Sequence, residues 1–167
     1  MRFRAAALLV LVTLAGCQPP MQDFTSEEYK FKARFPGKPK VESQSPAGMP
    51  TKMFAVEFKD GVYGVAVSDT PFGNEGPDAV QSRLDGARDG AIRNVGGIQK
   101  SSSPVMINNK YPGREFSASI TQPKPGQVRA RVYLVGSRFY QVMVMGTDGF
   151  ATGPKADEFL NSFQVID

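Results

Sequence analysis

The sequence predicts an α+β fold, mainly an antiparallel β-sheet with helices packed on it. Several segments alternate apolar and polar residues, which is the period of a half-buried strand. Two pairs of such segments are joined by dipeptides typical of tight hairpins, Asp60-Gly61 and Gly136-Ser137. One long stretch, from Pro77 to Val95, has helical spacing instead. The chain of 167 residues has the length of one ordinary domain with a core of its own.

The first expected strand is the segment from Tyr29 to Phe35, in which four apolar residues alternate with Lys30, Lys32 and Arg34. Pro36-Gly37 ends this strand, because proline cannot donate a hydrogen bond to a neighbouring strand. A weaker extended segment follows at Lys40 to Glu42, before a loop over residues 45–48. We therefore expect one half-buried strand and then a shorter one.

The first hairpin joins Thr51–Lys59 to Val62–Ser68. Its dipeptide suits a type I′ turn, in which both central residues have positive φ. If Lys59 lies opposite Val62, six large apolar residues share one face of the hairpin: Phe54, Val56, Phe58, Tyr63, Val65 and Val67. The other face carries small or polar residues, so we expect a sheet that is covered mainly on one side.

The expected long helix carries a narrow apolar stripe, formed by Val80, Leu84, Ala87, Ala91 and Val95. Pro77 suits its first turn, and Gly96-Gly97 ends it. Gly86 and Gly90 inside the helix each cost roughly 1 kcal/mol relative to alanine. A hinge or a close contact with a partner would explain the two glycines. Close packing of the helix on the sheet would also explain them, and we favour it.

Two further strands are expected at Ile98–Ile107 and Tyr111–Ile120, with Asn108-Asn109 as the turn between them. Residues 111–115 could form a recognition loop, but we favour a turn or bulge in which Gly113 supplies an unusual backbone angle.

The second hairpin joins Gln127–Val135 to Arg138–Met145 through a type II′ turn with Gly136 first. This register pairs Leu134 with Phe139, Tyr133 with Tyr140 and Ala130 with Met143. A short helix from Pro154 to Ser162 then presents Phe159, Leu160 and Phe163 to the core, and residues 164–166 end the fold.

The N-terminal segment has the layout of a signal peptide. Arg2 and Arg4 precede an apolar stretch from Ala5 to Leu14, which is too short to span a bilayer. The four residues Leu14-Ala15-Gly16-Cys17 resemble the bacterial lipobox. This resemblance implies cleavage before Cys17 and attachment of a diacylglyceryl group to its sulfur.

The predicted organisation is therefore a signal peptide over residues 1–16, a lipidated polar tether over 17–26 and a globular domain over 27–167. The tether contains Pro19-Pro20 and shows no apolar periodicity. We expect an extracytoplasmic protein anchored to a bacterial membrane through Cys17. Gln18, where Asp would favour the inner membrane, favours the periplasmic side of the outer membrane.

Composition excludes several kinds of chemistry. The chain has no histidine, so a Ser-His-Asp triad and His-ligated zinc are excluded. Its single cysteine is assigned to lipid, which removes thiol catalysis. Loss of residues 1–16 removes two of 20 basic residues and no acidic one, which leaves 18 against 16. This small charge gives no reason to expect a nucleic acid partner, and no motif predicts a cofactor.

Two clusters of polar residues are candidate sites. Arg129, Arg131 and Arg138 lie around the second hairpin with Lys124 in the adjoining turn, and could contact an anion or a lipid headgroup. We favour a solvated strand face for these residues, because surface arginine is common. The loop from Asp69 to Asp78 is rich in oxygen ligands but lacks the EF-hand spacing, so we expect no metal site there.

The order of the expected elements, together with Phe35-Pro36-Gly37-Lys38-Pro39 and Phe159-Leu160-Asn161-Ser162-Phe163, resembles the PsbP-like family over about Glu27 to Asp167. The resemblance implies a PsbP-like α/β sandwich. It supplies no shared catalytic residues, and it implies an assembly or accessory role. We therefore expect a non-enzymatic, membrane-anchored envelope lipoprotein that binds an envelope protein. The alternative is a small-molecule or lipid carrier that uses a cavity between the sheet and the helix.

Overall fold

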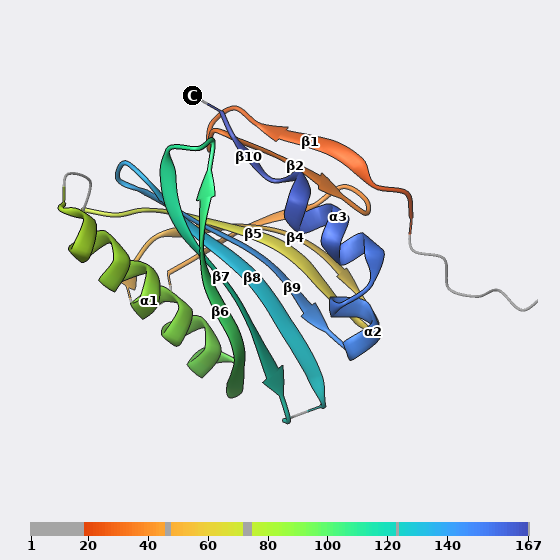
Figure 1. Ribbon diagram of the computed structural model, residues 1–167. Helices are drawn as coiled ribbons and strands as arrows, with labels where there is room; N and C mark the ends of the chain where they lie inside the picture. The colour runs from red at the N-terminus through yellow and green to blue at the C-terminus, as the bar shows by residue number, and fades with distance from the viewer. Residues whose placement is uncertain (1–18, 46–47, 72–74, 123, 167) are drawn as a thin grey trace, which may run out of the picture.

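The computed structural model describes residues 19–45, 48–71, 75–122 and 124–166, and these form three layers (Figure 1). The central layer is a seven-stranded sheet of order β3-β4-β5-β9-β8-β7-β6, in which every neighbouring pair is antiparallel. Helix α1 lies on one face of this sheet. A three-stranded antiparallel sheet of order β1-β2-β10 lies on the other face with α3. The predicted fold class is confirmed.

The bounds of the elements agree closely with the predicted segments. The strands of the large sheet are β3 (Lys40–Gln44), β4 (Thr51–Phe58), β5 (Gly61–Asp69), β6 (Gly97–Ile107), β7 (Tyr111–Ile120), β8 (Gly126–Val135) and β9 (Arg138–Gly146). The small sheet contains β1 (Gln22–Ser26), β2 (Phe31–Phe35) and β10 (Gln164–Val165). The helices are α1 (Pro77–Asn94), α2 (Asp148–Ala151) and α3 (Pro154–Ser162). Of the described helices, none is long and apolar enough to cross a membrane.

Strand β1 corrects the predicted boundary between tether and domain. The sequence places its five residues in the tether, yet they pair along the whole length of β2, with Phe24 opposite Ala33. The Phe24 ring lies 5.7 Å from Phe35 and 5.6 Å from Phe54. A single aromatic residue among polar ones gives no periodic signal, so the strand is specified by its partner and not by its own sequence.

The first hairpin has a register two residues away from the prediction. Val56 lies opposite Tyr63 and Phe54 opposite Val65, so the turn residues are Lys59 and Asp60. Neither of these has positive φ, and the turn is therefore not type I′. Because a shift of two residues preserves the alternation of faces, the six large apolar residues still share one face.

Glycine is needed at position 61 because neighbouring atoms come very close to its Cα, and not because of the turn. A Cβ atom at this position would lie 2.4 Å from the carbonyl oxygen of Met145 and 2.5 Å from the Phe150 ring. Gly113 has the same role, because its Cβ would lie 2.4 Å from the Tyr133 ring. The predicted unusual angle at Gly113 is wrong, since Gly113 has no positive φ and lies within β7.

The second hairpin matches its predicted register. Leu134 pairs with Phe139, Tyr133 with Tyr140 and Ala130 with Met143. Gly136 has a φ of 58° and Ser137 has no positive φ, as a type II′ turn requires. The Asn108-Asn109 turn is also confirmed, with φ values of 53° and 51° that asparagine tolerates well.

The main core lies between the two sheets and is unusually aromatic. Phe31, Phe35, Tyr63 and Phe159 are fully buried there, and the Phe31 and Phe54 ring centroids are 5.0 Å apart. Helix α3 contributes Phe159 and Leu160, as predicted. Phe163, just after the helix, stacks against Tyr133 with an interplanar angle of 7°. The second, smaller core lies under α1.

Helix α1 buries Leu84 and Ile92 against β7 and β8, whereas Val80, Ala91 and Val95 are only partly buried. The predicted reason for its glycines is wrong. A Cβ at Gly86 would meet nothing within 4 Å, and a Cβ at Gly90 would meet only the Arg93 guanidinium at 3.9 Å. Neither glycine is therefore needed for close packing on the sheet.

Candidate binding surface beside helix α1

Helix α1 covers only part of its face of the large sheet. It packs on β6, β7 and β8, and leaves the same face of β9, β5 and β4 without a covering helix. The side chains on this uncovered part are mostly apolar and partly exposed. We call it the methionine face and define it by Met49, Met53, Val62, Phe139, Met143 and Met145.

The strand register explains why these residues gather there. Met143 lies opposite Gly64, and Met53 lies opposite Ala66 on the next strand pair. A Cβ at Gly64 would be 3.5 Å from the sulfur of Met53 and 3.7 Å from the methyl group of Met143. The two methionine side chains therefore converge over Gly64, on the same side of the sheet as α1.

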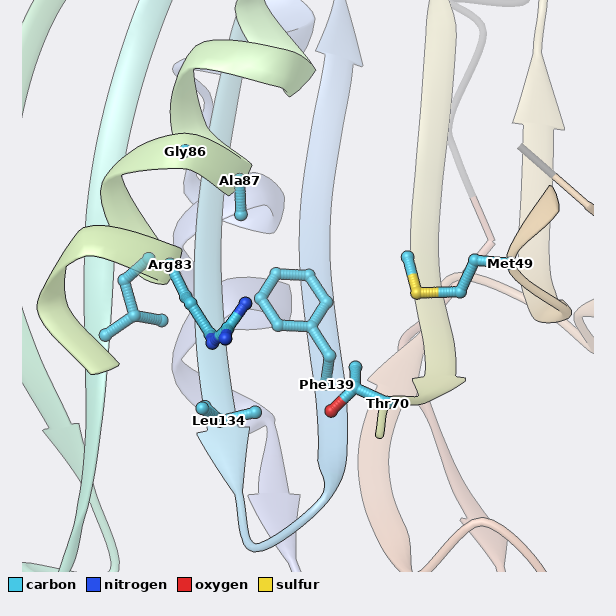
Figure 2. A pocket seen from close by; sticks show the side chains of 8 residues that line it. Met49, Thr70, Arg83, Gly86, Ala87, Leu134 and Phe139 are labelled. Atoms are coloured by element: carbon cyan, nitrogen blue, oxygen red, sulfur yellow. The ribbon is translucent and has the colours of Figure 1, made fainter. Parts of the chain in front are cut away.

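An apolar cavity of about 320 Å³ lies between α1 and the neighbouring strands. Figure 2 shows Arg83 and Ala87 of α1 on one side of it, Leu134 and Phe139 beneath, and Met49 and Thr70 on the opposite side. Gly86 also lines the cavity, which explains why its missing side chain leaves open space. Its lining is almost entirely apolar, so it suits hydrocarbon or aromatic groups.

The charged residue that lines this cavity is already engaged. Arg83 forms a bidentate ion pair with Glu75, just before the start of α1. This pairing lowers the pKa of Glu75, because the guanidinium stabilises the ionised carboxylate. Arg83 therefore borders an apolar hollow with its charge compensated.

Two further hollows continue across the methionine face. One, of about 190 Å³, is lined by Met53, Val62 and Met143 together with polar residues of β3. The other, of about 400 Å³, contains Met145 and Val62 and extends to Lys124. The three hollows make this face uneven, which suits side chains inserted from a partner surface.

No group of three or more acidic or cysteine side chains that could hold a metal ion occurs among the described residues. In the loop predicted to be rich in oxygen ligands, Asp69 is paired with Arg138 at 2.7 Å and Glu75 with Arg83. Asn74 lies outside the described residues. The Arg138 hydrogen bond also lowers the pKa of Asp69.

The four candidate anion-binding residues do not form one site. Arg129 contacts Asp157 of α3 at 2.7 Å, and Arg131 contacts Glu115 and donates to the Leu160 carbonyl at 2.9 Å. Both side chains point from β8 toward α3. Their side chains are 25% and 21% exposed and ion-paired, so the expected solvated strand face is wrong for this pair.

Arg138 and Lys124 lie at opposite ends of the large sheet. Arg138 is paired with Asp69 and lies over the Tyr29 ring, 5.8 Å from its centroid. Lys124 is exposed in the turn between β7 and β8. The three arginines therefore hold structural elements together, and of the four residues Lys124 alone is exposed.

The methionine face was not predicted from the sequence, although part of its signal is present. Alternation along β9 places Phe139, Met143 and Met145 on one side of the strand. What the sequence does not reveal is which strands α1 covers. An apolar strand residue has the same place in the alternation whether a helix covers it or lies beside it.

These layers match a known fold, the PsbP-like α/β sandwich. The solution structure of cyanobacterial PsbP (CyanoP) from Synechocystis sp. PCC 6803 is similar to this chain, with a TM-score of 0.58. The match covers 90% of this chain and 95% of that one, at 12% sequence identity. At this identity the likeness shows a common fold. The comparisons with family models and with curated proteins gave no match.

Proposed function

We propose that this protein is a lipid-anchored, extracytoplasmic accessory protein that binds a protein partner through its methionine face and has no catalytic role. The observation that carries the proposal is the apolar surface beside α1, which includes four of the chain's seven methionines. Methionine side chains are flexible and polarisable, and they are used at surfaces that adapt to apolar partners. The PsbP-like resemblance of the sequence also favours an accessory role.

The anchor is proposed from the lipobox alone, because Leu14 to Cys17 lie outside the described residues. Two or three acyl chains would hold the protein at a membrane, since each buried methylene adds about 0.8 kcal/mol of membrane affinity. Attachment to the periplasmic side of the outer membrane is part of the same proposal and rests on Gln18.

Replacing Cys17 by serine should abolish acyl labelling and leave the uncleaved precursor, because serine lacks the sulfur that receives the lipid. The measurement is intact-mass analysis of membrane and soluble fractions from cells that express each form. Normal processing and lipid labelling of Cys17→Ser would contradict the anchor.

Partner binding should depend on the apolar character of the methionine face. Met53→Glu places a charge in one of its hollows and should reduce the crosslinked partner at least tenfold, because an unpaired charge is costly to bury at an interface. Met106→Glu is the matched control, since Met106 is 60% exposed on edge strand β6. The measurement is quantitative mass spectrometry after crosslinking in native envelopes. Equal losses in both variants would argue against this face.

The alternative role as a carrier is favoured by the cavity of about 320 Å³. This volume is near the lower end for small-molecule sites, and it suits one short apolar group better than a whole lipid. Native mass spectrometry of the purified mature domain distinguishes the two roles: a carrier should retain a bound small molecule, and a partner-binding module should have the mass of the polypeptide alone.

A further inference from the structure

The chain already contacts the folded domain at Pro19, only two residues after the proposed lipid anchor at Cys17. The ammonium group of Lys155 donates a hydrogen bond to the Pro19 carbonyl at 2.8 Å. Met21 packs against the main core, and its carbonyl accepts a hydrogen bond from Arg34 at 3.5 Å. Strand β1 begins directly afterwards, at Gln22.

Because of this contact, the tether consists of the two peptide units between Cys17 and Pro19, and not of the ten residues 17–26. Consecutive Cα atoms are about 3.8 Å apart, so the Cα atoms of Cys17 and Pro19 can be separated by no more than roughly 7 Å. A domain tethered so closely cannot rotate freely above a bilayer. The surface around Pro19 must lie next to the lipids that carry the acyl chains.

The surface around Pro19 belongs to one end of the molecule, which we call the turn end. It contains the β4–β5 turn with Lys59, the β7–β8 turn with Lys124, helix α2 and the start of α3 (Figure 1). Lys59 and Lys124 border the same hollow, and Phe150 of α2 packs against Phe58 with ring centroids 6.0 Å apart. Lys155 lies in the first turn of α3, directly after α2.

We infer that the turn end is the membrane-facing surface of the protein, in contact with the headgroup layer of the bilayer. The inference rests on the proposed lipid anchor at Cys17. The short covalent reach sets the orientation, and the exposed lysines Lys59 and Lys124 suit anionic phospholipid. Asp60 and Asp148 at the same end match the charge of these two lysines, and exposed Glu57 borders the same hollow, so the orientation rests on the short covalent reach of the anchor and not on electrostatic attraction.

The orientation places the cavity beside α1 away from the membrane, whereas the hollow of about 400 Å³ at the Met145 end of the methionine face lies near it. Leu134 and Phe139, which line the cavity beside α1, flank the Gly136-Ser137 turn at the opposite end of β8 and β9. Strand β9 has nine residues, and at about 3.3 Å per residue it separates the two ends by roughly 30 Å. A ligand or partner therefore reaches the cavity from the aqueous side, and lipid from the anchoring bilayer does not.

Single labels at the two ends test this orientation. Lipidation consumes the only native thiol, so Gln122→Cys at the turn end and Ser137→Cys at the opposite end can each be labelled with one fluorophore. Both residues are polar and exposed in turns between strands of the same sheet. The acylated protein is bound to vesicles of phosphatidylethanolamine and phosphatidylglycerol that carry a nitroxide on the headgroup.

The label at position 122 should be quenched at least threefold more strongly than the label at position 137. A ten-residue Gly-Ser spacer inserted between Gln18 and Pro19 should abolish this difference while the protein still sediments with vesicles. Equal quenching of both labels in acylated, sedimenting protein would overturn the orientation and leave the anchor intact. Protein that is not acylated at Cys17 would overturn the anchor itself, and the orientation with it.

Discussion

Replacing Phe159 by alanine is expected to lower the free energy of unfolding by about 3–5 kcal/mol. Phe159 is fully buried, and its ring centroid lies 5.0 Å from that of Phe35 and 5.4 Å from that of Tyr63. It therefore joins α3 to a strand of each sheet. Truncation would leave a cavity between three rigid elements, which cannot collapse to fill it. Urea denaturation of the mature domain, followed by circular dichroism, measures the loss.

Ile98→Ala provides the comparison for this experiment. Ile98 is 65% exposed on β6, so removing its side chain should change the free energy of unfolding by no more than about 0.5 kcal/mol. A loss below about 1 kcal/mol for Phe159→Ala would contradict the assignment of this ring to the main core.

Features with strong local signals were predicted correctly from the sequence. The alternation in β2, the register of the β8–β9 hairpin and the bounds of α3 each depend on a few neighbouring residues. Strand β1 has no such signal, because its single apolar residue is Phe24, which contacts residues of β2 and β4. Its position depends on pairing with β2 and on contacts with β2 and β4, and not on its own sequence.

The first hairpin shows what the local signal cannot resolve. The Asp60-Gly61 pair predicts a type I′ turn, but the structure uses Gly61 to admit the Phe150 ring, almost ninety residues later in the sequence. The register therefore differs by two residues while the buried face stays the same. Periodicity fixes which face is buried, and distant contacts fix where the turn lies.

The candidate site also has features that the sequence predicts and features that it does not. The sequence shows that Arg129 and Arg131 share a strand face, but their partners, Asp157 and Asn161, lie on a helix that returns from the end of the chain. Likewise, the methionine face follows from the position of α1 over β6 to β8, which depends on the topology of the sheet. Charge and the alternation of residues along a strand predict neither the partners of these arginines nor the strands that α1 covers.

The glycines of this fold should respond to alanine in opposite ways. Gly146→Ala is expected to lower the free energy of unfolding by about 3 kcal/mol, because overpacking against rigid atoms is costly. Its Cβ would lie 2.3 Å from the Asp60 carbonyl oxygen and 2.8 Å from the Gly61 Cα, and both are backbone atoms. Gly86→Ala should instead raise the free energy of unfolding by roughly 1 kcal/mol, because alanine is the better helix former.

The opposite changes in the free energy of unfolding would distinguish two reasons why glycine occurs in this sequence. Gly146 is required by the close approach of three chain segments, whereas a side chain at Gly86 meets nothing within 4 Å and would only line the cavity. In thermal and urea unfolding, Gly146→Ala should therefore be less stable than the wild type and Gly86→Ala more stable. If Gly86→Ala destabilises the domain, then α1 bends or packs at this position in a way that its open surroundings do not explain. If it stabilises the domain but weakens partner crosslinking, the glycine is retained to keep the cavity beside α1 open.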